Sequence, residues 1–208
     1  MKTVFVNPER CIGCKQCEIA CAVEHSRSKN IYQAIFETPK STRRIHVAPG
    51  IHLDTSFPNK CRHCEPAPCK EICPTGAIDR APDLDNDTLD GYKCITCAMC
   101  AMVCPFDVIR FFKSPTVKLD KVVAVKCDHC IERQRQGQEP ACVEACKVGA
   151  LVFGNINELT KSAATKWARL ATIAADEIQP EMSSLPGHIE AWRSLGKKVG
   201  KTGKEASK

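Results

Sequence analysis

Sixteen cysteines constrain the fold of this 208-residue chain more than any other feature. They form four groups of four, in which the first two cysteines are always separated by two residues and the last two by three. We call them the first to fourth quartets: Cys11, Cys14, Cys17 and Cys21; Cys61, Cys64, Cys69 and Cys73; Cys94, Cys97, Cys100 and Cys104; Cys127, Cys130, Cys142 and Cys146. Only the middle gap varies, so the quartets constitute an internal repeat.

The first and third quartets have the spacing C-x2-C-x2-C-x3-C that binds 4Fe-4S clusters in bacterial ferredoxins. Three cysteines at such short intervals curl a loop around one face of a cubane and turn backbone N–H groups toward its sulfides. The fourth cysteine follows at the start of a short helix, and in two-cluster ferredoxins it ligates the other cluster. The sequence therefore predicts four 4Fe-4S clusters, held by quartets that work in reciprocal pairs.

The composition favours a fold that depends on metal. Aromatic residues make up only 5% of the chain, so side-chain burial needs help from metal-closed loops to offset the conformational entropy of folding. The formal net charge is +6, and four clusters with sixteen thiolates would lower it by about 8. The basic residues do not form one stripe, and we expect no nucleic-acid partner.

Two other uses of cysteine have to be weighed. Disulfides are typical of secreted proteins, but Met1 to Arg10 contains neither an apolar stretch of signal-peptide length nor a twin arginine. No apolar run approaches the roughly 18 residues of a transmembrane segment, so we expect a cytoplasmic protein, soluble or peripheral to a membrane complex. A zinc-binding interaction module is the distant alternative, although a tetrahedral zinc site gives no reason for a third cysteine at the next C-x2-C step.

Short strands are predicted next to the cysteine loops, in an α+β framework. The hairpin between Cys73 and Cys94 is of the kind that joins the two halves of a two-cluster ferredoxin. The predicted strands are Thr3 to Val6, Ala77 to Asp79, a returning strand that leads to Cys94, Val108 to Phe112, Lys121 to Val125 and Ala150 to Phe153.

From Asn155 onward the chain has no cysteine, which marks a domain boundary. An apolar stripe at steps of three and four residues predicts a helix that ends before Pro180. This helix either covers the cluster domains or docks on a partner. A second short helix is expected over Gly187 to Leu195, followed by a flexible basic tail from Lys197 to Lys208. The stripe consists of Leu159, Ala163, Trp167, Leu170, Ala174 and Ile178.

Two histidines stand between neighbouring ligands, His63 in the second quartet and His129 in the fourth. Both quartets already supply four thiolates, so we do not expect imidazole ligation of the Rieske type. We expect instead that a ring N–H lies near a cluster sulfur and raises the potential of that cluster. His25 shows no pairing pattern. We find no nucleophile with a base, no phosphate-binding glycine loop and no flavin fingerprint, and we assign no catalytic residue.

With these motifs placed, residues 1–154 resemble the four-cluster iron-sulfur subunits of the dimethyl sulfoxide reductase and formate dehydrogenase type. The resemblance implies two nested bacterial-ferredoxin-like dicluster domains, with a C-terminal helical extension over residues 155–208. The outer domain would be discontinuous, with residues 1–55 and 113–154, and would close around an inner domain of residues 56–112. Such subunits transfer electrons and are not catalytic.

The resemblance also implies a nested set of ligands, three from one quartet and one from its partner. Carried over position by position, the sets are Cys11, Cys14, Cys17 and Cys146 for cluster 1; Cys61, Cys64, Cys69 and Cys104 for cluster 2; Cys94, Cys97, Cys100 and Cys73 for cluster 3; and Cys127, Cys130, Cys142 and Cys21 for cluster 4.

Within this superfamily, the opening stretch NPERCIGCKQCEIACAVEHSRSKNIYQAIFE is similar to the ferredoxin-like subunit associated with carbon monoxide dehydrogenase. This implies that electrons pass from carbon monoxide dehydrogenase, as donor, to a hydrogenase or another acceptor. The alternative is the electron-transfer subunit of a formate dehydrogenase, another molybdenum oxidoreductase or a hydrogenase.

Overall fold

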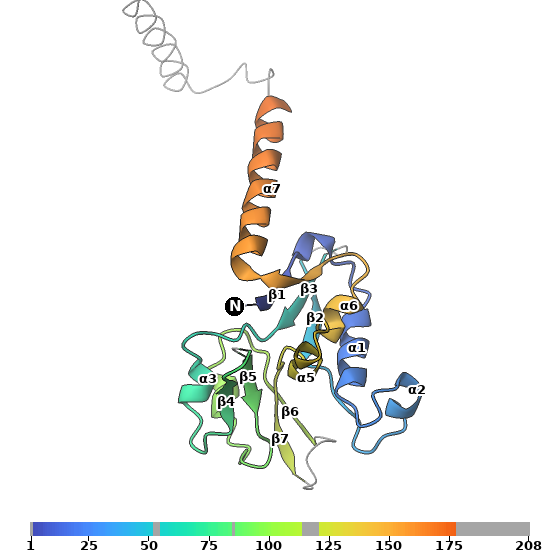
Figure 1. Cartoon of the computed structure of the whole chain (residues 1–208), viewed down its shortest axis with the longest axis vertical. Coiled ribbons are helices and arrows are strands. Elements are labelled where there is room, and N and C mark those ends of the chain that lie inside the picture. The colour runs from blue at the N-terminus through green and yellow to red at the C-terminus, as the bar shows by residue number, and fades with distance from the viewer. Residues whose placement is uncertain (1, 52–54, 85, 114–120, 178–208) are drawn as a thin grey trace, which may run out of the picture. The chain divides into compact units, whose positions relative to one another are not determined.

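The computed structural model describes residues 2–51, 55–84, 86–113 and 121–177 (Figure 1). The predicted second helix and basic tail, and Ile178 of the apolar stripe, lie outside these ranges. The chain divides into two compact units, Met1–Leu159 and Thr160–Lys208. All sixteen cysteines belong to the first unit, and none of them forms a disulfide.

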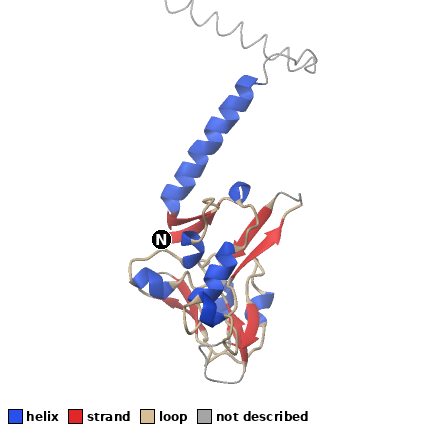
Figure 2. Ribbon diagram, turned by 90° about the vertical axis from the view of Figure 1, so that its right-hand side faces the viewer, coloured by secondary structure: helices blue, strands red, loops and turns tan. Residues whose placement is uncertain are grey.

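The strands of the first unit pair into four separate two-stranded antiparallel sheets (Figure 2). One sheet joins the two ends of the unit, and the other three are formed by segments closer in sequence. The pairs are β1 (Lys2–Val6) with β8 (Leu151–Asn155), β2 (Ile45–Pro49) with β3 (Ser56–Lys60), β4 (Ile78–Ala81) with β5 (Asn86–Leu89), and β6 (Arg110–Lys113) with β7 (Val122–Val125). A two-stranded sheet is marginally stable by itself.

The helices of the first unit are about one turn long, except for α1 (Gln16–Glu24), which is longer. The short helices are η1 (Pro8–Arg10), α2 (Ile31–Ala34), α3 (Pro68–Glu71), α4 (Met99–Met102), α5 (Ile131–Arg135) and α6 (Ala141–Glu144). Helices this short are not stable in isolation. Their stability has to come from what they pack against.

Cysteines occur in each of the three hydrophobic clusters that form the core. One cluster is centred on Ile78 and Val123, a second on Val4 and Ile45, and a small third on Val108. Each contains cysteines of at least two quartets. The aliphatic core is therefore thin, and thiols fill much of it.

The α+β fold class predicted from sequence is confirmed, with short strands beside each cysteine loop. The sheets β2–β3 and β6–β7 connect residues on either side of the predicted boundaries at 55/56 and 112/113. The division into an outer and an inner domain stays a prediction.

Helix α7 (Ile156–Glu177) begins where the cysteine-free segment was predicted to start. The backbone N–H of Asn157 donates a hydrogen bond to the Asn155 side chain at 3.0 Å, which satisfies one of the free donors of the first turn. Trp167, Leu170 and Ile173 are exposed.

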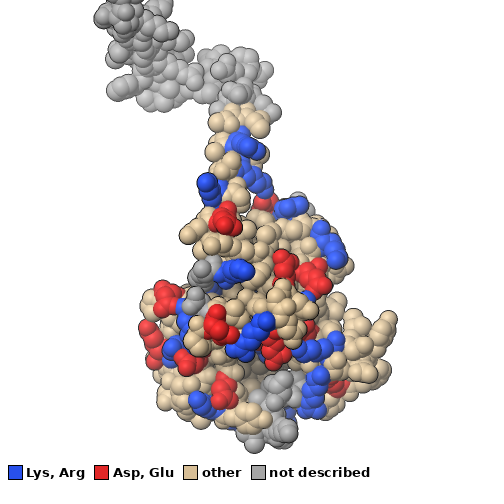
Figure 3. All heavy atoms as spheres, viewed as in Figure 1, with Lys and Arg blue, Asp and Glu red and all other residues tan. Residues whose placement is uncertain are grey.

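The charged side chains on the face shown in Figure 3 are mixed in sign, with Lys and Arg interspersed among Asp and Glu. In the ranges that the structure describes, every helix falls short of the length or the apolar content that a membrane span requires.

Candidate iron-sulfur cluster sites

The third and fourth cysteines of every quartet are four residues apart, about one helical turn, and the third lies on a helix. These helices are α1, α3, α4 and α6, in the order of the quartets. Helix α1 packs against α6, and α3 packs against α4. The first quartet therefore meets the fourth, and the second meets the third.

The thiols of the first quartet interact with the last cysteine of the chain. Burial raises the pKa of Cys17 to about 11, and negative charge at Cys146, Glu18 and Cys11 adds to the rise. Cys14, the remaining member of the predicted set for cluster 1, is exposed. These contacts bring cysteines from opposite ends of the first unit into one group.

The other end of the same quartet interacts with the fourth quartet. Burial raises the pKa of Cys21 to about 12, and Cys127 adds to the rise. Burial also raises the pKa of Cys142, to which negative charge at Cys127, Cys21 and Cys130 contributes. Four thiols that oppose one another's ionisation in a buried site require a bound cation when they are deprotonated.

The second quartet shares its site with Cys104 of the third. Burial raises the pKa of Cys64, with contributions from Cys61 and Cys104. Burial likewise raises the pKa of Cys69 to about 11, and Cys61 and Cys104 add to the rise.

The third quartet shares its site with Cys73 of the second. Burial raises the pKa of Cys100, and Cys94, Cys97 and Cys73 contribute to the rise. The same four cysteines line one cavity. The structure thus groups interacting cysteines of the first and fourth quartets, and of the second and third. The complete ligand sets that the resemblance implies stay a prediction.

The residue before the second cysteine has a left-handed backbone in every quartet. The four residues and their φ angles are Gly13 at 69°, His63 at 50°, Thr96 at 62° and His129 at 55°. Such angles are uncommon for residues other than glycine, and strained backbone persists where a site requires it. Here it curls each loop, so that the N–H groups of His63 and His129 donate to the Sγ atoms of Cys61 and Cys127 at 3.4 Å.

Backbone N–H groups outside the loops also point at cysteine sulfurs. Arg44 donates to Cys21 Sγ at 3.2 Å, and Ala77 donates to Cys73 Sγ at 3.3 Å. Hydrogen bonds of this kind stabilise negative charge on the ligands of an iron-sulfur cluster. Interacting thiols, with N–H groups that donate to the sulfurs of Cys21, Cys61, Cys73 and Cys127, fit the donor set of 4Fe-4S clusters.

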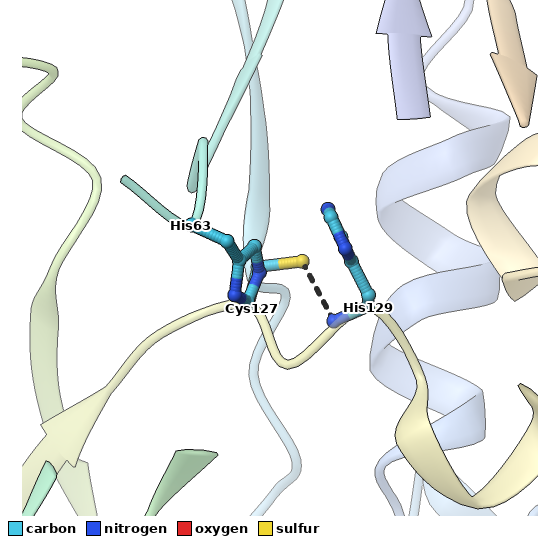
Figure 4. Close-up of side chains that lie close together, drawn as sticks. All are labelled: His63, Cys127 and His129. Carbon is cyan, nitrogen blue, oxygen red and sulfur yellow. Dashed lines mark hydrogen bonds between the residues drawn. The ribbon is translucent and has the colours of Figure 1, made fainter. Parts of the chain in front are cut away.

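His63 and His129 meet between the second and fourth quartets (Figure 4). Both are 1% exposed, and their ring centroids are 3.9 Å apart. Ligand atoms of the two rings and Cys127 Sγ lie within 4.8 Å of one another. His63 Nδ1 accepts a hydrogen bond from the Asp87 N–H at 2.9 Å, and Nδ1 of His129 lies 3.1 Å from Asn86 Oδ1. The predicted effect of the rings on cluster potential stays a prediction.

Asp128 ties the fourth quartet to residues that follow the first. It pairs with Arg44 Nη1 at 2.7 Å and with His25 Nε2 at 3.1 Å, and it accepts the N–H of Cys130 at 2.9 Å. Burial acts to raise the pKa of Asp128, but the His25 hydrogen bond and the Arg44 charge hold it well below its usual range. His25, for which the sequence showed no pattern, therefore supports this loop.

Replacing Asp128 by asparagine tests that support. Asparagine keeps an oxygen for the Cys130 N–H but removes the charge that Arg44 and His25 face, so we expect the activation free energy of unfolding to fall by about 1–3 kcal/mol. The measurement is the anaerobic unfolding rate in urea, because cluster loss makes unfolding irreversible. Asp83→Asn, which breaks the exposed pair with Arg135, is the control, and we expect it to leave the unfolding rate almost unchanged because water screens the pair. Equal effects of the two variants would contradict the assignment.

Comparison with known proteins agrees with this chemistry. Residues 54–156 match the family described as "4Fe-4S dicluster domain", and residues 3–35 match the family described as "4Fe-4S binding domain". The electron transport protein HydN of Escherichia coli K12 is 34% identical over 177 residues, covering 81% of this chain and 96% of HydN.

Two further relatives cover most of the same region. An iron-sulfur protein of Rhodospirillum rubrum is 39% identical over 155 residues, 71% of this chain and 79% of the relative. The B subunit of the anaerobic dimethyl sulfoxide reductase of Haemophilus influenzae is 32% identical over 194 residues, 88% of this chain and 87% of that subunit. The chain therefore belongs to the family of ferredoxin-like 4Fe-4S electron-transfer proteins that includes HydN and the B subunit of dimethyl sulfoxide reductase.

Proposed function

We propose that this protein is a non-catalytic relay, in which single electrons pass through four 4Fe-4S clusters held by the four nested ligand sets. The observation that carries the proposal is that each group of interacting thiols contacts the next group. There are four such groups, and each contains cysteines of two quartets, which supports the ligand sets.

The contacts between thiol groups give the proposed relay an order. Cys17 and Cys21, from the sets for clusters 1 and 4, lie in one hydrophobic cluster. Cys61 and Cys127, from the sets for clusters 2 and 4, lie in another. Predicted ligands of iron-sulfur clusters 2 and 3 share the remaining hydrophobic cluster, which contains Cys69 and Cys100 among others.

The resulting order is cluster 1, cluster 4, cluster 2, cluster 3. Cys14 and Cys97 are the exposed cysteines, and they belong to the sets for clusters 1 and 3. Electrons would therefore enter and leave at the two ends of the series, and the middle clusters would be enclosed by protein.

We further propose carbon monoxide dehydrogenase as the donor and a hydrogenase or another oxidoreductase as the acceptor. The support is the similarity of residues 7–37 to the subunit that accompanies carbon monoxide dehydrogenase. The second candidate is electron transfer for a formate dehydrogenase, another molybdenum oxidoreductase or a hydrogenase. The match to the dimethyl sulfoxide reductase B subunit supports this second candidate.

The donor is tested by mixing the oxidised holoprotein anaerobically with carbon monoxide dehydrogenase under CO. We expect rapid bleaching of the visible iron-sulfur absorbance at catalytic amounts of the dehydrogenase. Formate dehydrogenase with formate serves as the parallel reaction. Clusters that stay oxidised with CO, but are reduced with formate, would replace the first candidate by the second.

A further inference from the structure

A five-residue pattern occurs twice, around the first two ligands of the second and fourth quartets. Residues 60–64 read KCRHC and residues 126–130 read KCDHC. In both copies a lysine precedes the first cysteine, at or just after the end of a strand, β3 or β7. Lys60 is 0% exposed and Lys126 is 3% exposed, which is rare for an ammonium group unless an anion compensates it.

The side chain of Lys60 contacts both its own quartet and the fourth. Its Nζ donates to the carbonyl of Cys61 at 3.0 Å and lies 2.9 Å from His129 Nε2, so the ammonium reaches the loop of the fourth quartet. Burial raises the pKa of Cys127 and Cys142, and in both cases the charge of Lys60 opposes the rise. The lysine adjacent to a predicted ligand of cluster 2 thus acts on ligands of cluster 4.

The side chain of Lys126 contacts Asp87, which in turn contacts the second quartet. Its Nζ donates to the carbonyl of Asp87 at 3.1 Å and lies 3.6 Å from Asp87 Oδ2. The backbone N–H of the same aspartate donates to His63 of the second quartet. Burial raises the pKa of Cys69 to about 11, and the charge of Lys126 opposes this rise. Each lysine therefore precedes one quartet in the sequence and acts on thiols of the other quartet, and we call the two lysines exchanged in this sense.

The charges around the two lysines differ. Among the described residues Lys60 has no carboxylate as an ion-pair partner, whereas Lys126 shares Asp87 with Arg80, whose Nε lies 3.2 Å from Asp87 Oδ1. Burial lowers the pKa of Lys60, because an unpaired buried charge is strongly destabilising, and negative charge at Cys127 and Cys142 opposes that change. The thiolates of the neighbouring quartet, with a cluster that carries a net charge of about −2 when oxidised, supply the missing anion for Lys60.

We propose that Lys60 and Lys126 are exchanged counter-charges, such that Lys60 raises the reduction potential of cluster 4 and Lys126 that of cluster 2. The proposal rests on the ligand sets of the proposed function. Reduction adds one electron from the redox partner and makes the cluster more negative, and a fixed ammonium nearby stabilises that state more than the oxidised one. No proton is transferred in this step.

The exchange makes the reduction potential of cluster 2 depend on the loop of the fourth quartet, and that of cluster 4 on the loop of the second. Because Asp87 offsets part of the charge of Lys126, we expect the larger effect at Lys60. The proposed effect is electrostatic and requires no contact between the lysines and iron.

The test uses Lys60→Met in the full holoprotein, since methionine fills similar volume without charge. Cluster 4 is labelled by Cys142→Asp, which alters its EPR signal, and cluster 2 is labelled in a separate background by Cys69→Asp. In an EPR-monitored redox titration we expect Lys60→Met to disfavour reduction of the labelled cluster 4 by tenfold or more, which for one electron is a shift of about 59 mV or more to lower potential. The labelled cluster 2 should shift by much less, and Lys60→Arg should restore the cluster 4 potential.

Lys70→Met is the matched control. Lys70 is adjacent in sequence to Cys69 but is half exposed and paired with Asp79, so water screens its charge and the potentials should not move. A shift of cluster 2 instead of cluster 4 in Lys60→Met, or no shift with all clusters present, overturns the proposal. If Lys60→Met loses a cluster, loss of cluster 4 supports the exchange and loss of cluster 2 alone overturns it. A wild-type iron content far below about sixteen per chain overturns the ligand sets themselves.

Discussion

Anaerobic removal of iron by a chelator is expected to unfold the Met1–Leu159 unit. Its sheets have two strands each and most of its helices are single turns, neither of which is stable alone. Buried cysteines occur in all three hydrophobic clusters, so removing the metal leaves the core without its cross-links. Free energy of metal binding is then largely free energy of folding.

The measurement should follow the core itself, because helix α7 lies largely in the other unit and contributes helical signal of its own. Methyl NMR signals of Ile45 and Val123, each 1% exposed, report on two different hydrophobic clusters. We expect both to lose their dispersion in the apoprotein and to regain it when iron and sulfide are restored. Native-like dispersion in a metal-free sample would show that the protein scaffold folds without clusters.

Cys21→Ser is expected to remove cluster 4 and to leave cluster 1 intact, although Cys21 belongs to the first quartet by sequence. The reason is that its thiol interacts with Cys127 and Cys142. A lost cubane lowers the iron content by about four atoms per chain, from about sixteen. The effect is large because serine is a poor ligand for this site, and a cluster with three thiolates is labile.

Double variants identify the shared cluster. If Cys21 and Cys142 ligate the same cluster, Cys21→Ser with Cys142→Ser should lose no more iron than either change alone, since coupled residues are not additive. Cys21→Ser combined with Cys17→Ser should lose about eight iron atoms, because two clusters are affected. The reverse pattern would assign Cys21 to cluster 1 and refute the nested sets.

Sequence spacing was enough to predict the chemistry of the sites. The prediction that the fourth cysteine of each quartet lies at the start of a short helix was wrong: the third cysteine lies there, on α1, α3, α4 or α6, and in three quartets the fourth follows the end of the helix. The strands that were predicted combine β-branched residues with turn residues at their ends, as in Thr3 to Val6, which lies within β1.

The sheet formed by β2 and β3 was not predicted. Pro58 lies in the middle of β3 opposite Val47, and a proline within a run argues against a strand unless the strand is at an edge. In a two-stranded sheet both strands are edges, so proline is tolerated. That β1 pairs with β8 was also unforeseen, because local patterns do not specify partners so distant in sequence.

The charges that support the sites were missed for a different reason. Asp128 and His25 are 103 residues apart in sequence, and no local pattern links them. Lys60 and Lys126 did leave a signal, the repeated K-C-x-H-C, but a lysine beside a cysteine suggests surface exposure until the fold shows that it is buried. Composition alone does not distinguish a solvated lysine from an internal one.

The pairing of β1 with β8 has a consequence for biosynthesis. The ribosome has to translate Leu151–Asn155 before Lys2–Val6 can find its partner, and α1 waits similarly for α6. Until then the thiols of the first quartet lack a bound cluster and are accessible to oxidants and to other metal ions. Residues 61–104, by contrast, hold two complete quartets and emerge earlier, so cofactor loading is expected to begin there and to finish only after Cys146 has been translated.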